Sequence, residues 1–244
     1  MNNLAIAVAR RELRGLFASP LSAVFLVIFL VTAGFFTFNL GAFFERNEAS
    51  LFAFFIWHPW LYLFLVPAVG MRLWSEDKRQ GTIELLLTFP VTPWQAILGK
   101  FLASWAFLAI ALVLTFPMVF TVNYLGDADM GPIICGYVGS FLLAGSYLAI
   151  TSMTSAMTRS QVVSFIISVV ICLFLILAGY PPVTDMFSGW ATMFIEIISG
   201  FSVMTHFERF QRGVLDIRDI VYFLSLIAFA LFATSFIIRS ERSR

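Results

Sequence analysis

The segment WSEDKRQGTIELLLTFPVT, residues 74–92, is a short polar interruption in a chain that is otherwise strongly apolar. Hydrophobic residues make up 60% of the 244 positions and charged residues only 12%, whereas an average soluble domain is about a quarter charged. The mean hydropathy is +0.93. A water-soluble fold of this length could not bury so much apolar surface. The composition therefore predicts an all-α integral membrane protein in which the 74–92 segment lies outside the hydrocarbon.

Six apolar segments are long enough to cross a bilayer as helices, which takes about 20 residues each. None of them carries an acidic or basic residue well inside its apolar core. Only residues 158–160 separate the fourth segment from the fifth, which predicts a tight antiparallel hairpin. We expect a single membrane domain over residues 1–244, with spans at about 21–40, 53–73, 99–124, 132–157, 161–180 and 219–239.

The fourth segment contains small residues at four-residue spacing. Gly136, Ser140 and Ala144 form one such row, and Gly145 and Ala149 form a second. Small residues at this spacing let helix backbones approach one another closely in membranes. The pattern favours helix packing over a role in transport.

The distribution of Lys and Arg predicts the orientation of the six spans, since positive residues concentrate on the cytoplasmic side. With the N-terminus in the cytoplasm, eleven of the 15 Lys and Arg residues fall on the cytoplasmic side. The other four lie outside: Arg46, Arg209, Arg212 and Arg218. We therefore expect both termini to be cytoplasmic.

The residue pattern of 1–19 predicts an amphipathic helix that lies in the inner membrane interface. An apolar stripe that includes Leu13 and Phe17 alternates with Arg10, Arg11 and Arg14, which would face the lipid head groups. This pattern fits a simple anchor as well as any further role.

The connection at 74–98 would lie in the cytoplasm in this orientation. On a continuous helix, Glu76, Gln80, Glu84 and Thr88 form one polar stripe because they are four residues apart. The segment could rest on the membrane surface or contact a soluble partner. Anionic lipids attract Lys and Arg rather than Glu, which favours the partner.

The long outer connection, residues 181–218, is more apolar than an ordinary loop. Its aromatic and aliphatic residues recur at helical spacing, but Glu196 and the flanking glycines argue against a full span. We expect a re-entrant or interfacial helical segment. It would serve as an outer gate or a docking surface, or else as an aromatic belt that seals the rim.

Enzyme classes find no support in the sequence. The only histidines are His58 and His206, and neither belongs to an H-E-x-x-H zinc motif. There is no G-x-S-x-G motif and no phosphate-binding G-x₄-G-K-[ST] loop. We expect no catalytic residue, no metal site and no cofactor in this chain, so any use of ATP and Mg²⁺ must rely on another polypeptide.

Two motifs carry a resemblance to a known family. Residues 72–103, RLWSEDKRQGTIELLLTFPVTPWQAILGKFLA, resemble the segment after the second span of ABC-2-type transporter permeases. Residues 202–225, SVMTHFERFQRGVLDIRDIVYFLS, are similar to a segment of the gliding-motility-associated permeases and of their relatives in nitrous-oxide-reductase maturation. The matched residues in the first motif, with the polar stripe, are Glu76, Gln80, Gly81, Thr82, Glu84, Pro90 and Val91; those in the second are His206, Phe207, Arg212, Gly213, Asp216 and Asp219.

The resemblance implies a permease subunit in a bacterial inner membrane that pairs with a second permease protomer. Each permease of this kind binds a separate ATPase, and residues 74–98 would form the coupling helix that contacts it. A membrane protein with a large extracytoplasmic domain is a further possible partner. The Phe-rich, uncharged spans favour export of a lipidic, amphipathic or polymeric substrate. The alternative is a complex that transmits ATP-driven motion across the membrane without moving a solute.

Overall fold

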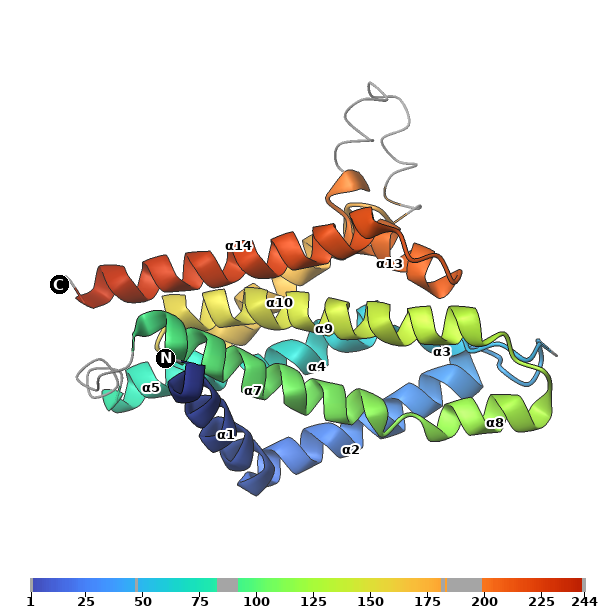
Figure 1. Cartoon of the computed structure of the whole chain (residues 1–244), viewed down its shortest axis with the longest axis horizontal. Coiled ribbons are helices and arrows are strands. Elements are labelled where there is room, and N and C mark those ends of the chain that lie inside the picture. Colours follow the sequence, from blue (N-terminus) through green and yellow to red (C-terminus); the bar gives the residue numbers. More distant parts are fainter. Residues whose placement is uncertain (1, 47, 83–91, 181–182, 184–198, 243–244) are drawn as a thin grey trace.

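The computed structural model is helical and describes residues 2–46, 48–82, 92–180, 183 and 199–242. Its helices run mostly along one long axis, so that the chain forms an elongated bundle (Figure 1). In chain order the elements are α1 (Asn2–Ala18), α2 (Pro20–Phe35), the π-helical segment η1 (Phe36–Leu40), α3 (Phe52–Phe55), α4 (His58–Gly70), α5 (Arg72–Gln80), α7 (Pro93–Val113), α8 (Pro117–Leu125), α9 (Met130–Met157), α10 (Gln161–Leu177), α13 (Val203–Gln211) and α14 (Ile217–Arg242).

Four helical stretches in the described part of the chain are long and apolar enough to cross a membrane: Pro20–Leu40, Pro93–Leu125, Met130–Met157 and Ile217–Ser240. They correspond to the predicted first, third, fourth and sixth spans. The predicted fifth span is the shorter apolar helix α10. The predicted second span, 53–73, is not one helix, because the chain is divided there into α3, α4 and the start of α5. The count of six spans therefore stays a prediction.

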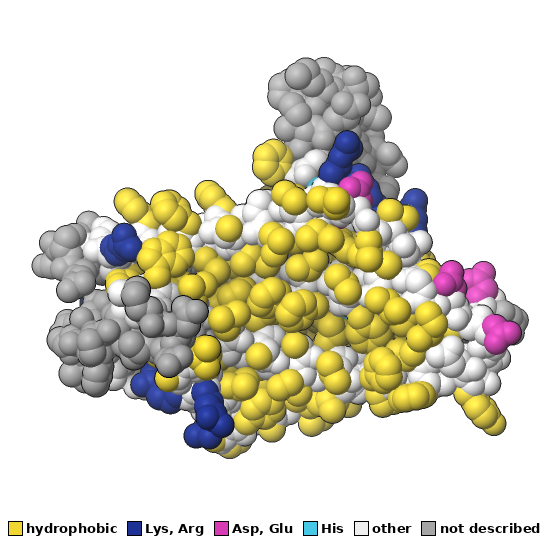
Figure 2. Space-filling model, in the orientation of Figure 1, with side chains coloured by type: hydrophobic (Ala, Val, Ile, Leu, Met, Phe, Trp, Pro, Cys, Tyr) yellow, Lys and Arg dark blue, Asp and Glu magenta, His cyan; other side chains and the backbone are white. Residues whose placement is uncertain are grey.

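Helix α9 is the centre of the bundle. Within its most apolar window, 78% of the residues are buried, compared with 22–33% in the other three long stretches. It packs against α4, α5, α7, α10, α13 and α14. Helices that surround a buried one keep an outer face free, and an apolar outer face is what a lipid environment requires. Figure 2 shows hydrophobic side chains over the middle of the bundle.

The small residues of α9 make this close packing possible, as their spacing predicts. A methyl group added at Gly136 would lie 2.5 Å from the ring of Phe55, and one at Gly145 would lie 2.7 Å from the indole of Trp105. The indole N–H of Trp105 also donates a hydrogen bond of 2.9 Å to the carbonyl of Phe141, also on α9. Side chains of α3 and α7 thus lie directly against the α9 backbone.

Proline positions explain several helix boundaries. Pro20 begins α2. Pro93 begins α7, and Thr92 and Gln95 form a reciprocal capping box at this start. Pro117 begins α8, which breaks the predicted third span, 99–124, into two helices. The predicted hairpin is confirmed: α9 ends at Met157 and α10 begins at Gln161.

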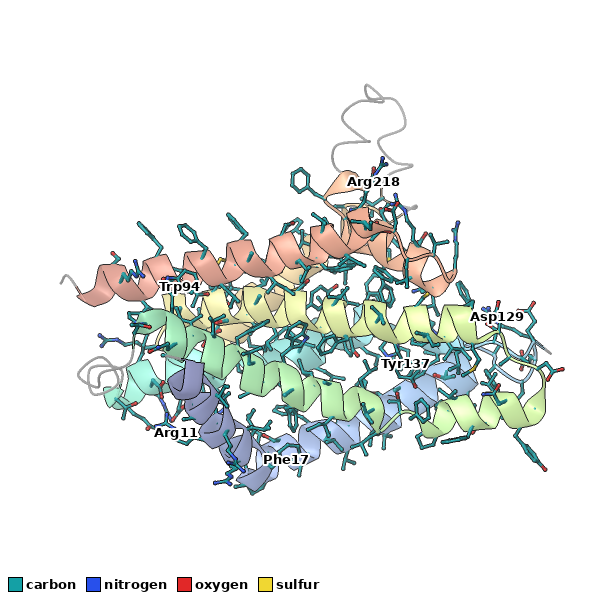
Figure 3. The ribbon with its side chains drawn as sticks, viewed as in Figure 1. Arg11, Phe17, Trp94, Asp129, Tyr137 and Arg218 are labelled. Carbon is teal, nitrogen blue, oxygen red and sulfur yellow. The ribbon has the colours of Figure 1, made fainter. Side chains whose placement is uncertain are left out.

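Helix α1 is amphipathic, as predicted, and packs along α7. Phe17 makes an edge-on contact with Phe107 of α7, with ring centroids 5.4 Å apart. Arg10, Arg11 and Arg14 are exposed, and Figure 3 marks Arg11 and Phe17 on this helix. Its placement in a membrane interface stays a prediction.

Candidate functional site

The two ends of the bundle hold the residues that the sequence motifs single out. We call one the α5 end; it comprises α5, the first turns of α7, and the turn between α9 and α10. We call the other the α13 end; it comprises α13 and the first turns of α14. Trp94 and Asp129 mark the two extremes of the bundle in Figure 3, with Trp94 at the α5 end.

The junction between α4 and α5 is built around one hydroxyl group from α9. The backbone N–H groups of Trp74 and Ser75 both donate hydrogen bonds of 3.0 Å to Oγ of Ser155. The Ser155 hydroxyl in turn donates to the carbonyl of Met71 at 2.8 Å. The indole N–H of Trp74 donates to Oγ of Ser152, also at 3.0 Å. The serines of α9 thus fix the direction in which α5 leaves α4.

A buried lysine joins α5 to α7. Nζ of Lys100 donates to the carbonyl of Leu73 at 2.8 Å and to the Asp77 carboxylate at 2.6 Å. The same ammonium lies 5.1 Å from the centre of the Trp74 ring, within the range of a cation–π contact. Only 6% of the Lys100 side chain is exposed, so its charge depends on these partners.

Glu76 links α5 to the start of α10 through a side-chain hydrogen bond. Its carboxylate accepts hydrogen bonds from Arg79 at 2.7 Å and from the side-chain amides of Gln80 and Gln161. The hydrogen bond from Arg79 lowers the pKa of Glu76, and the Gln80 amide acts in the same direction. The Glu76 carboxylate is thus engaged inside the chain, whereas Arg79 and Gln80 are exposed.

The expected continuous helix from 76 to 88 is wrong, because α5 ends at Gln80. Gly81 adopts the left-handed conformation, with φ of 70°, which terminates the helix. The Thr82 hydroxyl lies 3.4 Å from the Asp77 carbonyl. The remaining motif residues lie outside the described residues: Glu84, Pro90 and Val91.

At the α13 end, a buried carboxylate links α13 to α14. Asp219 is fully buried, and its Oδ1 lies 2.6 Å from Nδ1 of His206 and accepts a 3.0 Å hydrogen bond from Arg209. Nε2 of His206 lies 3.0 Å from the carbonyl of Gly200. Both ring nitrogens face acceptors, and both can donate only in the protonated imidazolium. The ring stacks on Tyr222 with centroids 3.9 Å apart.

Most of the other residues of the second motif shape this end, and only Asp216 also reaches the cluster, with its carboxylate 4.0 Å from the Arg209 guanidinium. Phe207 is buried in the core. Gly213 has φ of 80° and forms the turn after α13. Asp216 caps α14 by accepting a 2.9 Å hydrogen bond from the backbone N–H of Arg218. Arg212 is exposed and lies 3.7 Å from Glu208.

Four residues that make important contacts at the α5 and α13 ends were not among the site residues predicted from the sequence. Arg209 could have been found, since it lies three residues after His206 and therefore on the same face of α13. Lys100 could also have been found, because a lysine in the first turns of a predicted span needs a partner. Ser152 and Ser155 carry no comparable signal, since buried serines are common on tightly packed membrane helices.

Comparison with known families adds an independent finding. The family model described as ABC-2 family transporter protein matches residues 61–242, which include both the α5 end and the α13 end. The comparison with curated proteins found no match. Since the match covers well over half of the chain, this protein belongs to the ABC-2 family of transporter proteins, whose members are multi-pass membrane permease subunits that work with a partner ATPase.

Proposed function

We propose that the chain is the permease subunit of an exporter, and that a separate ATPase drives it by contacting the α5 end. The observation that carries this proposal is the attachment of α5 to the bundle. Ser155 of α9, Lys100 of α7 and Gln161 of α10 each bond to α5 or its junction. A force applied to α5 therefore reaches α7, α9 and α10 through short contacts that are buried or partly buried. Such an element suits the transmission of motion from a soluble subunit.

We further propose six spans with both termini in the cytoplasm of a bacterium, across its inner membrane. Helix α10 has 17 residues, about 26 Å at 1.5 Å per residue, which is close to the hydrocarbon thickness. The region of α3 and α4 would supply the remaining span. Eleven of the 15 basic residues then fall on the cytoplasmic side. Figure 2 shows Lys and Arg side chains at the α5 end and also beside α13, and acidic side chains at the extreme opposite α5.

For the substrate we propose a lipidic, amphipathic or polymeric molecule, and the outer faces of the helices support this choice. Phe35 and Val31 of α2 and Phe174 of α10 are more than half exposed and apolar. A lipidic, amphipathic or polymeric substrate fits such faces, and a second permease protomer would complete the pathway. ATP and Mg²⁺ would bind to the ATPase.

The second candidate function is the transmission of motion to an extracytoplasmic partner without solute transport. The cluster of Asp219, His206 and Arg209 favours it, because it ties α13 rigidly to the first turns of α14, and α14 runs to the α5 end (Figure 1). This is the arrangement expected of a gliding-motility-like or copper-enzyme-maturation-like complex that has an accessory membrane protein.

The test uses a separate ATP-binding-cassette ATPase subunit from the same organism as the probe, captured from membranes by the tagged permease. Gln80→Arg adds a cation at the exposed end of α5, where the Glu76 carboxylate is already engaged by Arg79 and Gln161. An unmatched charge in an interface costs several kcal/mol, so capture should fall at least about tenfold. Glu48→Arg, at an exposed position outside the α5 end, should leave capture unchanged. Equal capture by both variants would exclude α5 as the docking element.

A further inference from the structure

An open hollow lies between the start of α2, α5 and the turn between α9 and α10. Its volume is about 700 Å³. Three arginines line it, one from α5 near its start, one near its end, and one from the turn: Arg72, Arg79 and Arg159. Glu76 is the only acidic residue in the lining, and Leu21 and Val162 form its apolar side. The hollow therefore combines a positive rim with an apolar base.

The three arginines of the hollow outnumber its one carboxylate, that of Glu76, on which the charge of Arg72 also acts. Arg79 donates to Glu76, and the Glu76 carboxylate is further engaged by Gln80 and Gln161. By contrast, the structure gives Arg72 and Arg159 no ion pair or side-chain hydrogen bond with any part of the chain that it describes. Both side chains are exposed. Three guanidinium groups around one carboxylate leave the hollow with a net positive charge. Such a lining suits an anion, and a phosphate in particular, because guanidinium matches its geometry.

Two apolar stripes run along the helices from this hollow. On α10, Val162, Ile166 and Val170 follow one another at four-residue spacing, and each is between 44% and 65% exposed. On α2, Leu21, Val24 and Ile28 share one face and are 38–51% exposed. Helix α4 contacts both of these helices. Exposed apolar residues in line with a cationic hollow provide a path for hydrocarbon chains next to a phosphate site.

We propose that this hollow binds the head group of an anionic phospholipid, with its phosphate on Arg72 and Arg159 and its acyl chains along the stripes of α2 and α10. The charge and the apolar path together select this occupant, since a free phosphate needs no stripe and a neutral lipid needs no arginine pair. The inference deepens the proposed membrane role, and it rests on the proposed orientation only for the leaflet, which would be the anionic cytoplasmic one.

The experiment measures lipid retention by the purified chain, with native mass spectrometry after titration with phosphatidylglycerol or phosphatidylcholine. Each basic residue near an anionic surface contributes about a fivefold gain in affinity, so the double variant Arg72→Gln/Arg159→Gln should bind phosphatidylglycerol about 30-fold more weakly. Arg218→Gln is the matched control, because Arg218 is exposed and lies beside α13 (Figure 3). It should retain the affinity of the wild type.

Three outcomes would overturn the proposal: equal affinity of the double variant and the wild type, equal retention of the two lipids, or displacement of phosphatidylglycerol by millimolar inorganic phosphate. The last outcome would show that the arginines bind phosphate without a lipid. Retention is read on the chain alone, without the ATPase. A failure of the proposed ATPase contact therefore leaves this readout unchanged, and the two failures are distinguishable.

Discussion

Replacement of Ser155 by alanine tests the construction of the α4–α5 junction. The Ser155 hydroxyl is the acceptor for two backbone N–H groups, those of Trp74 and Ser75, and both residues are buried. Ser155→Ala removes the acceptor and leaves both donors without a partner in a region that water does not reach. A buried donor left unsatisfied costs about 1–3 kcal/mol. The Ser75 N–H can partly recover by donating to Met71 four residues earlier, so we expect a total loss of about 2–4 kcal/mol.

The loss should be visible as a lower midpoint of thermal unfolding. At about 2–4 °C per kcal/mol for a chain of this size, the midpoint should fall by about 5–15 °C. The assay is the fraction of chain that stays monodisperse in size-exclusion chromatography after heating in detergent.

A second buried serine of α9 provides the matched control. Ser140 is as fully buried as Ser155, but its hydroxyl has no hydrogen-bond partner among the residues that the structure describes. Ser140→Ala should therefore be neutral or slightly stabilising. If the two variants lose the same stability, the Ser155 hydrogen bonds do not hold the junction and the reasoning is refuted.

Two further predictions concern the α13 end and the packing of α9. Asp219→Asn removes the charge that Arg209 contacts and should cost about 1.5–3 kcal/mol, whereas Asp127→Asn, at an exposed position, should leave the unfolding midpoint unchanged; equal midpoints would argue against a stabilising cluster. Gly145→Ala places a methyl group 2.7 Å from the indole of α7 and should destabilise by about 1–3 kcal/mol. Gly15→Ala, with open space around it, should gain up to about 1 kcal/mol, and a gain in both variants would contradict the close approach of α7 and α9.

The predictions from sequence succeed where a local pattern has a single physical consequence. Small residues in α9 predict close helix contacts, and the Thr158–Ser160 connection predicts a hairpin. Each of these patterns is compatible with only one local structure. Pro20 likewise predicts the start of α2.

The second predicted span is not one continuous helix, and composition could not show this because it does not reveal helix breaks. Residues 53–73 are apolar throughout, yet the chain turns at 56–57 and again at Met71, where hydrogen bonds to a distant serine replace the regular helical ones. Such a break depends on Ser155, 84 residues away. The periodic stripe through Glu76 failed for a local reason, since the left-handed Gly81 ends the helix.

The predicted site residues likewise divide into those that a local pattern identifies and those whose contacts depend on tertiary packing. The pairing of His206 with Asp219 was implied only by membership in one motif, and their contact depends on how α13 packs against α14. The engagement of Glu76 by Gln161 of α10 is a tertiary contact across 85 residues, which spacing along the chain cannot predict.

The central claim is that a separate ATPase contacts this permease at the α5 end. The most direct measurement is photo-crosslinking from a single benzoylphenylalanine placed at Gln80 or at Asp127, two exposed positions at opposite ends of the bundle, in membranes that contain the partner ATPase. We expect the ATPase to be crosslinked from position 80 and not from position 127. Crosslinking from position 127, or from neither position while the two proteins co-purify, would contradict the claim.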